Sequence, residues 1–156
     1  MMDMEKKEAY ELMLLQLKGL LEAESNWLAN LANSSALLNE TLPDTVFAGY
    51  YLFQEGELIL GPFQGRVSCT RIQLGKGVCG ESAAEKKTMI VDNVKEHENY
   101  ISCDSAAMSE IVVPMLDNDQ LIGVLDIDSS KTSSYDEIDQ LFLEKFAASL
   151  VAARRN

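Results

Sequence analysis

The sequence is short of histidine, of paired cysteines and of basic residues, and each shortage excludes a class of function. His97 is the only histidine among 156 residues, and no CxxC pair occurs, so a zinc site is not expected. The sequence has 13 Lys and Arg residues and 25 Asp and Glu residues, which gives a net charge of −12. Because so acidic a surface repels phosphate groups, neither nucleic acid nor an anionic membrane is an expected partner.

Long apolar runs are also absent. No stretch reaches the roughly 18 apolar residues that a membrane-spanning helix needs, and the charged start MMDMEKKEAYELM does not resemble a secretory signal peptide. The three cysteines, Cys69, Cys79 and Cys103, are odd in number, which is unlike a secreted disulfide framework. We therefore expect a cytoplasmic protein whose thiols either fill the core or carry redox chemistry.

The signals that are present predict a single α+β domain covering residues 1–156. Leucines at helical spacing predict two helices within residues 5–39, and Asn26 is a candidate N-cap between them. Runs rich in β-branched and aromatic residues predict six strands, at residues 45–53, 57–63, 68–74, 88–94, 110–116 and 120–129. This order of elements indicates an antiparallel sheet with helices on one face.

Glycines and serines mark two further helices. The glycine-rich turn GKGVCG (75–80) leads into a short helix predicted at 81–87. Ser133 or Ser134 is expected to cap a closing helix after the last strand. A polar loop of about 15 residues separates the fourth and fifth strands, and ordered loops of this length are usually functional or mobile.

Four acids at or near strand ends form a candidate constellation. Asp126 and Asp128 are two residues apart in VLDIDS, so both side chains share one face of an apolar strand. Glu110 begins the strand expected to pair with this one, and Asp92 ends TMIVD. Each alone fits a hydrated strand end, but clustered carboxylates repel, so at least one should have a raised pKa. Such a cluster suits ammonium binding or a protonated acid that donates a hydrogen bond.

The thiols allow two interpretations. Cys103 lies in the 95–109 loop, in YISCDS, where few apolar neighbours support a role as buried filler. Cys69 has arginines close on both sides, and Cys79 follows Lys76 near a predicted helix start. Positive charge and a helix N-terminus both lower the pKa of a thiol. Composition alone still allows all three cysteines to be structural.

Aromatic side chains complete the candidate set. Phe47 and Tyr51 are four residues apart on one predicted strand, so they share a face. They either wall a pocket for a small apolar group or fill the core, and core packing is the better expectation for Phe47.

Taken in order, the segments LGPFQG, Cys69, GKGVCGE, VDNV, SCDS, SEIVVP and GVLDIDS resemble the free methionine-(R)-sulfoxide reductases, which are single-domain GAF proteins. The resemblance runs in register from about residue 45 to 130. It implies a GAF-like, six-stranded antiparallel sheet flanked by N- and C-terminal helices, in a protein that is usually dimeric. It also implies reduction of free L-methionine (R)-sulfoxide to methionine without a metal or an organic cofactor.

The resemblance implies a role for each candidate residue. Cys103 attacks the sulfoxide sulfur and becomes a sulfenic acid, which Cys69 resolves as a disulfide that thioredoxin or a similar dithiol reduces. Cys79 matches an auxiliary third cysteine, while Glu110 or Asp128 protonates the sulfoxide oxygen. Residues matching the family's substrate-binding acids and pocket aromatics are Asp92, Asp126, Phe47 and Tyr51. Phe47 stands where the family commonly has Trp, and it keeps an apolar wall without the indole N–H.

Two alternatives remain open. GAF domains often sense small molecules such as cyclic nucleotides, so the chain could be a non-catalytic binding module. Four clustered acids, however, would repel a nucleotide phosphate. The leucine-rich N-terminal helix could instead make the chain a structural dimerisation domain, which predicts no sensitivity to thiol chemistry.

Overall fold

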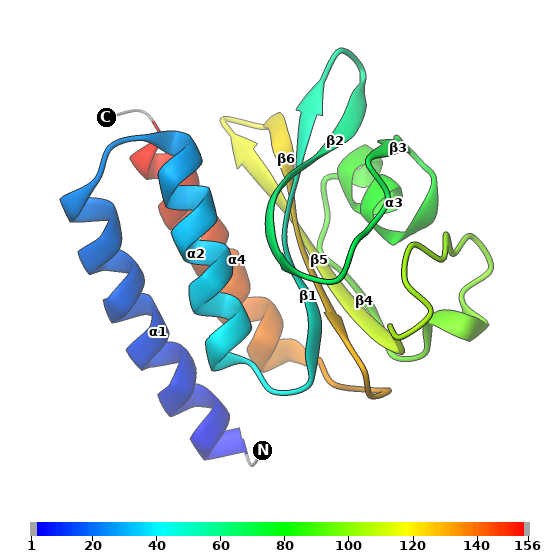
Figure 1. Cartoon of the computed structure of the whole chain (residues 1–156), viewed down its shortest axis with the longest axis horizontal. Helices are drawn as coiled ribbons and strands as arrows, with labels where there is room; N and C mark the ends of the chain where they lie inside the picture. Colours follow the sequence, from blue (N-terminus) through cyan, green and yellow to red (C-terminus); the bar gives the residue numbers. More distant parts are fainter. Residues whose placement is uncertain (1–2, 155–156) are drawn as a thin grey trace.

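A computed structural model describes residues 3–154 of the chain (Figure 1). Its strands are β1 (Thr45–Gln54), β2 (Glu57–Gly65), β3 (Arg71–Gln73), β4 (Met89–Val91), β5 (Ser109–Asp117) and β6 (Gln120–Ser129). They form one sheet in the order β3-β2-β1-β6-β5-β4, in which all neighbouring strands are antiparallel. The predicted six-stranded α+β fold is confirmed, although β3 and β4 have only three residues each.

Helices cover both faces of this sheet. The three long helices, α1 (Asp3–Ala23), α2 (Trp27–Thr41) and α4 (Glu137–Ala153), gather on one face, and α3 (Gly77–Glu85) lies on the other (Figure 1). A 3₁₀ turn, η1 (Val94–Glu96), follows β4. The expectation that all helices share one face is therefore wrong, because α3 covers the second face. None of the helices within residues 3–154 combines the length and the hydropathy of a membrane span.

The helix starts show where sequence signals succeed and fail. The Asn26 side chain accepts a hydrogen bond from the Ala29 amide at 2.9 Å, as predicted for the N-cap of α2. The cap of α4 is Asp136, and not Ser133 or Ser134. Asp136 accepts from the amides of the first turn, while Asp139 accepts from the Asp136 amide, which makes a reciprocal capping box.

The sheet separates two apolar clusters, one on each face. The larger cluster packs α1, α2 and α4 against the sheet, and it includes Tyr10, Met13 and Leu150. The smaller cluster lies on the α3 side and contains Phe47, Tyr51 and Cys79, among others. Because side chains alternate along a strand, Phe47 and Tyr51 face the smaller cluster, while Ala48 and Tyr50 face the larger one. The three cysteines and the buried acids of β5 and β6 lie on the α3 side of the sheet.

Candidate active site

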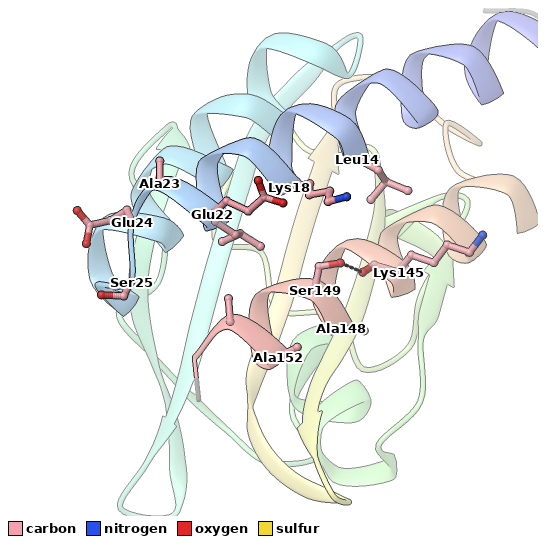
Figure 2. Close-up of a pocket in the computed structure, with 12 residues that line it drawn as sticks. Leu14, Lys18, Glu22, Ala23, Glu24, Ser25, Lys145, Ala148, Ser149 and Ala152 are labelled. Carbon is pink, nitrogen blue, oxygen red and sulfur yellow. Dashed lines mark hydrogen bonds between the residues drawn. The ribbon is translucent and has the colours of Figure 1, made fainter. Parts of the chain in front are cut away.

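A small cavity on the α3 side brings most of the predicted site residues together. Six of the nine candidate residues line it, namely Tyr51, Cys79, Cys103, Glu110, Asp126 and Asp128. A larger, more open groove runs between α1 and α4 on the other face (Figure 2), and its walls combine Lys18, Glu22 and Lys145 with small and apolar side chains. No cysteine lines that groove. The smaller cavity is therefore the candidate active site.

Three carboxyl groups form the floor of this cavity because of strand register. Glu110 on β5 lies directly opposite Asp128 on β6, and Asp126 lies two residues before Asp128 on the same strand face. Glu110 and Asp126 are only 6% and 4% exposed. Burial raises the pKa of Glu110 and of Asp128 well above the ordinary value, and the neighbouring charge of Asp126 adds to the rise. Burial also raises the pKa of Asp126.

The expectation of a raised pKa in this cluster is thus confirmed. The buried cluster therefore keeps its protons to higher pH than an exposed carboxyl does. A retained proton is what a general acid or a neutral hydrogen-bond donor requires, and the remaining negative charge suits a bound ammonium group.

Cys79 lies against this cluster in the first turn of α3. Its Sγ is 3.8 Å from Glu110 Oε2, and the side chain is 4% exposed. Burial, followed by the charges of Asp126 and Glu110, raises the pKa of the Cys79 thiol well above its ordinary value. The expectation that Lys76 and a helix start favour a thiolate here is therefore wrong. Lys76 is exposed, whereas the carboxyl groups are in direct contact with the thiol.

α3 itself begins earlier than the predicted residue 81. Gly75 and Gly77 adopt positive φ of 85° and 64°, which lets the chain turn directly into a helix at Gly77. A Cβ on Gly80 would meet the Gln73 carbonyl oxygen at 2.5 Å, so a side chain there would push the helix away from β3. The turn and the helix thus overlap, which places Cys79 within the cavity wall.

The other two cysteines are joined across the mouth of the cavity. Cys69 and Cys103 form a disulfide, with their Cα atoms 5.2 Å apart and 34 residues apart in sequence. The Tyr51 hydroxyl donates to the Cys69 carbonyl oxygen at 2.9 Å and lies 2.9 Å from Ser68 Oγ, so it fixes the loop that carries Cys69. The pairing implied by the family resemblance is therefore present in the structure.

The arginines near Cys69 are committed to carboxylates. Arg66 Nε lies 3.0 Å from Asp104 Oδ2, and Arg71 pairs with Glu57 across β2 and β3. The Arg66–Asp104 pair spans the same two loops as the disulfide, because Asp104 directly follows Cys103. Arg66 therefore links the two loops that carry Cys69 and Cys103, while Arg71 links two strands.

Three predicted site residues are not among those that line the cavity: Cys69, which is bonded to Cys103, and Phe47 and Asp92. Phe47 is 1% exposed and stacks between Tyr51 and Phe63, with ring centroids 6.1 Å and 5.0 Å away. It supports the cavity wall from behind, in agreement with its expected place in the core. The side chain of Asp92 is exposed and does not line the cavity, although it was expected among the buried acids.

The 95–109 loop supplies cavity residues that sequence reasoning missed. Tyr100 and Ile101 line the cavity beside Cys103. Burial, followed by the charge of Glu110, raises the pKa of the Tyr100 hydroxyl. The signal was present in YISCDS, since an aromatic and a branched apolar residue are unusual in an otherwise polar loop.

Three of the cavity side chains are also close enough to share a cation. The potential ligand atoms of Cys79, Glu110 and Asp126 lie within 4.8 Å of one another. A metal site requires a thiolate and ionised carboxylates. Because burial opposes ionisation of all three groups, the set favours protons over a metal ion.

Comparisons with known proteins agree with this geometry. Residues 34–154 match the GAF domain family. The free methionine-R-sulfoxide reductases of Saccharomyces cerevisiae and Escherichia coli are 44% and 42% identical to this chain, over 93% and 94% of it and 85% and 89% of their own lengths. The structure of the Neisseria meningitidis enzyme in complex with its substrate superposes with a TM-score of 0.93 at 40% identity, covering 96% of this chain and 90% of that one. The chain belongs to the free methionine-R-sulfoxide reductase family of GAF-domain proteins.

Proposed function

We propose that this protein reduces free L-methionine (R)-sulfoxide to methionine. The observation that carries the proposal is the Cys69–Cys103 disulfide above a floor of buried carboxyl groups with raised pKa values. In its reduced form the cysteine pair supplies two electrons, and the carboxyl groups supply protons. A sulfoxide needs both, because its sulfur is a poor electrophile until its oxygen is protonated or hydrogen-bonded.

The reaction begins from the reduced cysteines. Cys103 Sγ attacks the sulfoxide sulfur while Glu110 or Asp128 donates a proton to the sulfoxide oxygen. The oxygen then moves to Cys103 Sγ as the substrate S–O bond and the new S–S bond break, so methionine leaves and Cys103 becomes a sulfenic acid; the thiol proton replaces the one that the carboxyl group donated. Cys69 then attacks Cys103 Sγ, the S–O bond breaks, and the oxygen departs as water. Each cycle therefore converts two thiols and one sulfoxide into one disulfide, methionine and water.

Substrate selection follows from the charge and enclosure of the cavity. Asp126 and its neighbouring carboxyls would bind the α-ammonium group, which only a free amino acid offers. Tyr51, backed by Phe47, would contact the methyl end. The 95–109 loop closes over the ligand and leaves no room for a polypeptide. The side chain of Asp92 is exposed and lies outside the cavity lining. Its role in binding the substrate stays a prediction.

A dithiol protein such as thioredoxin is the proposed reductant. Cys69 and Cys103 are both partly exposed, so a thiolate from outside can attack the disulfide and exchange with it. A cytoplasmic location would supply such reductants and keep Cys79 reduced.

The protein is proposed to act as a homodimer of single GAF domains, each formed by residues 1–156. α1 offers an exposed apolar row for pairing with a second copy, in which Met4, Leu12 and Leu15 are 73%, 57% and 68% exposed. Cys79 is proposed as an auxiliary thiol beside the carboxyl cluster. No metal or organic cofactor takes part in the proposed cycle.

The direct test is NADPH oxidation in the presence of thioredoxin and its reductase. Free methionine (R)-sulfoxide should be turned over, whereas the (S) epimer and an N-acetylated (R)-sulfoxide should not, because neither presents both the correct sulfur geometry and an ammonium group. Failure of all three substrates, with dithiothreitol as an alternative reductant, would overturn the proposal and favour a GAF binding module.

Cys69→Ser should separate the two halves of the cycle. The variant should release about one equivalent of methionine per Cys103, and then stall with thioredoxin because no partner thiol remains to resolve the sulfenic acid. A small dithiol should restore turnover. The measurement is methionine released per subunit in a single-turnover reaction, followed by steady-state assays with each reductant. Full thioredoxin-dependent turnover would show that Cys69 is not the resolving cysteine.

A further inference from the structure

Glu81 holds the 95–109 loop against α3 through two side chains of that loop. His97 Nε2 lies 2.7 Å from Glu81 Oε1, and Asn99 Nδ2 donates to the same oxygen at 3.1 Å. Asn99 Nδ2 also donates to the Gly75 carbonyl oxygen at 2.8 Å. One carboxylate oxygen thus accepts two hydrogen bonds from loop residues that lie 16 and 18 positions further along the sequence.

This attachment lies beside the cavity. Glu81 follows Cys79 by two residues on α3, while His97 and Asn99 precede Tyr100, Ile101 and Cys103 on the loop. The loop is seated closely on the helix start, because a Cβ on Gly77 would lie 3.3 Å from three carbons of Ile101. A shift of the loop at His97 would therefore move the cavity wall directly.

Among the contacts that hold the loop in the oxidised protein, three kinds differ in their response to reduction and to solvent. Besides the Glu81 contacts, these are the Cys69–Cys103 disulfide and the Arg66–Asp104 ion pair. The disulfide is absent from the reduced form that must bind substrate. In the Arg66–Asp104 pair the Asp104 side chain is 8% exposed but Arg66 is 64% exposed, so solvent and salt reach the cation and weaken the pair, whereas both side chains of the other pair, Glu81 and His97, are only 20% and 23% exposed. In the reduced protein the Glu81 contacts are the better-shielded attachment.

We propose that Glu81 is a positioning residue: through His97 and Asn99 it keeps the 95–109 loop seated over the cavity when the Cys69–Cys103 disulfide is open. Seating of the loop would keep Cys103 and Tyr100 over the carboxyl cluster. The value of this for catalysis rests on the proposed reductase function. The seating of the loop does not depend on that function, so loop seating and reductase activity can be tested separately.

The hydrogen-bond chemistry supplies a conservative variant. His97 donates from Nε2 either as an imidazolium or as the neutral tautomer with hydrogen on Nε2, so an amide oxygen at position 81 can replace the carboxylate as acceptor. Glu81→Gln keeps this acceptor and removes the charge, while Glu81→Ala removes both. Glu85→Ala is the matched control, since Glu85 is an exposed carboxylate on the same helix.

The first readout uses the buried thiol of Cys79 and requires no sulfoxide. In a Cys69→Ser/Cys103→Ser background, Cys79 is the only thiol in the sequence. Glu81→Ala in this background should speed its reaction with N-ethylmaleimide by about tenfold, which corresponds to about 1.4 kcal/mol in the opening equilibrium of the loop. Glu81→Gln and Glu85→Ala should both stay within about twofold of the background protein. The Gln variant also controls for the effect of the lost charge on the reactivity of Cys79.

The second readout is kinetic and uses the full set of cysteines. Glu81→Ala should lower kcat/KM for free methionine (R)-sulfoxide by about tenfold, with most of the loss in KM, because bound substrate helps to reseat the loop. Glu81→Gln should restore the value. A general weakening of the fold would affect Glu81→Ala and Glu85→Ala alike. It would not raise KM in Glu81→Ala alone.

A His97→Ala/Asn99→Ala variant approaches the same contacts from the loop, and it keeps the test decisive if Glu81→Ala does not fold. It should reproduce the faster labelling. The seating role would be overturned if Glu81→Ala and His97→Ala/Asn99→Ala were both labelled at the rate of Glu85→Ala. It would also be overturned if Glu81→Gln were labelled as fast as Glu81→Ala. If the wild-type protein shows no turnover, the proposed function fails, and the labelling rates alone decide the role of Glu81.

Discussion

Cys103→Ser should abolish methionine formation, with a loss on the order of 10³-fold or more. A serine hydroxyl is a far weaker nucleophile than a thiol, and it cannot accept oxygen from a sulfoxide to form a sulfenic acid. Even one equivalent of methionine should therefore not appear when the reduced variant is mixed with the sulfoxide. The measurement is methionine per subunit in a quenched single turnover, without any added reductant.

Cys69→Ser is the matched control for this result. Both variants lose the same disulfide, so both remove the same constraint from the 95–109 loop. They differ in whether the attacking thiol remains. Thermal unfolding of the two variants should therefore agree closely, while only Cys69→Ser releases methionine. Release from Cys103→Ser with none from Cys69→Ser would exchange the two roles.

Glu110→Gln should lower the rate of the methionine-releasing step by about 10²-fold or more, which is typical for loss of a general acid. Glutamine keeps the size of the side chain but has no acidic proton for the sulfoxide oxygen. Because burial raises the pKa of Glu110, the wild-type protein should be most active while the cluster keeps its proton, and its activity should fall as pH rises through that raised pKa. Both effects can be measured as single-turnover rates from about pH 5 to about pH 9, a range that covers typical raised carboxyl pKa values.

Stability should move in the opposite direction to activity in this variant. A carboxyl group with a raised folded-state pKa contributes stability that is fully present below its unfolded pKa, and that is lost as pH rises through the folded pKa. Glutamine does not ionise, so Glu110→Gln should lose less thermal stability than the wild-type protein as pH rises. An equal loss in both proteins would show that Glu110 is ionised in the fold. Asp128→Asn tests whether the proton is shared across the pair.

Much of the site could be predicted because it follows strand geometry. A spacing of two placed Asp126 and Asp128 on one face, and the two-residue turn at 118–119 between β5 and β6 brought Glu110 opposite Asp128. The same periodicity paired Phe47 with Tyr51. These relations are local or depend on one short turn, so the sequence contains the information directly.

What could not be predicted depends on contacts across the fold. The pKa of Cys79 is raised by burial and by carboxyl groups more than 30 residues away, and these outweigh its neighbours in sequence. Asp92 follows a strand of only three residues at the sheet edge, where nothing covers its side chain. The contact of Glu81 with His97 joins a helix to an irregular loop, for which no periodicity exists.

The position of the disulfide determines the order in which substrates bind. Cys103 lines the cavity, and in the oxidised protein its sulfur is bonded to Cys69 across the mouth. Sulfoxide and reductant therefore meet different forms of the protein, and neither has to bind while the other is present. We therefore expect ping-pong kinetics, in which the reductant restores both thiols before the next sulfoxide reacts. If a dithiol is the reductant, as proposed, the oxidised form should accumulate when dithiols are scarce, so the redox state of the surroundings should set the fraction of the protein in which Cys103 is free to react.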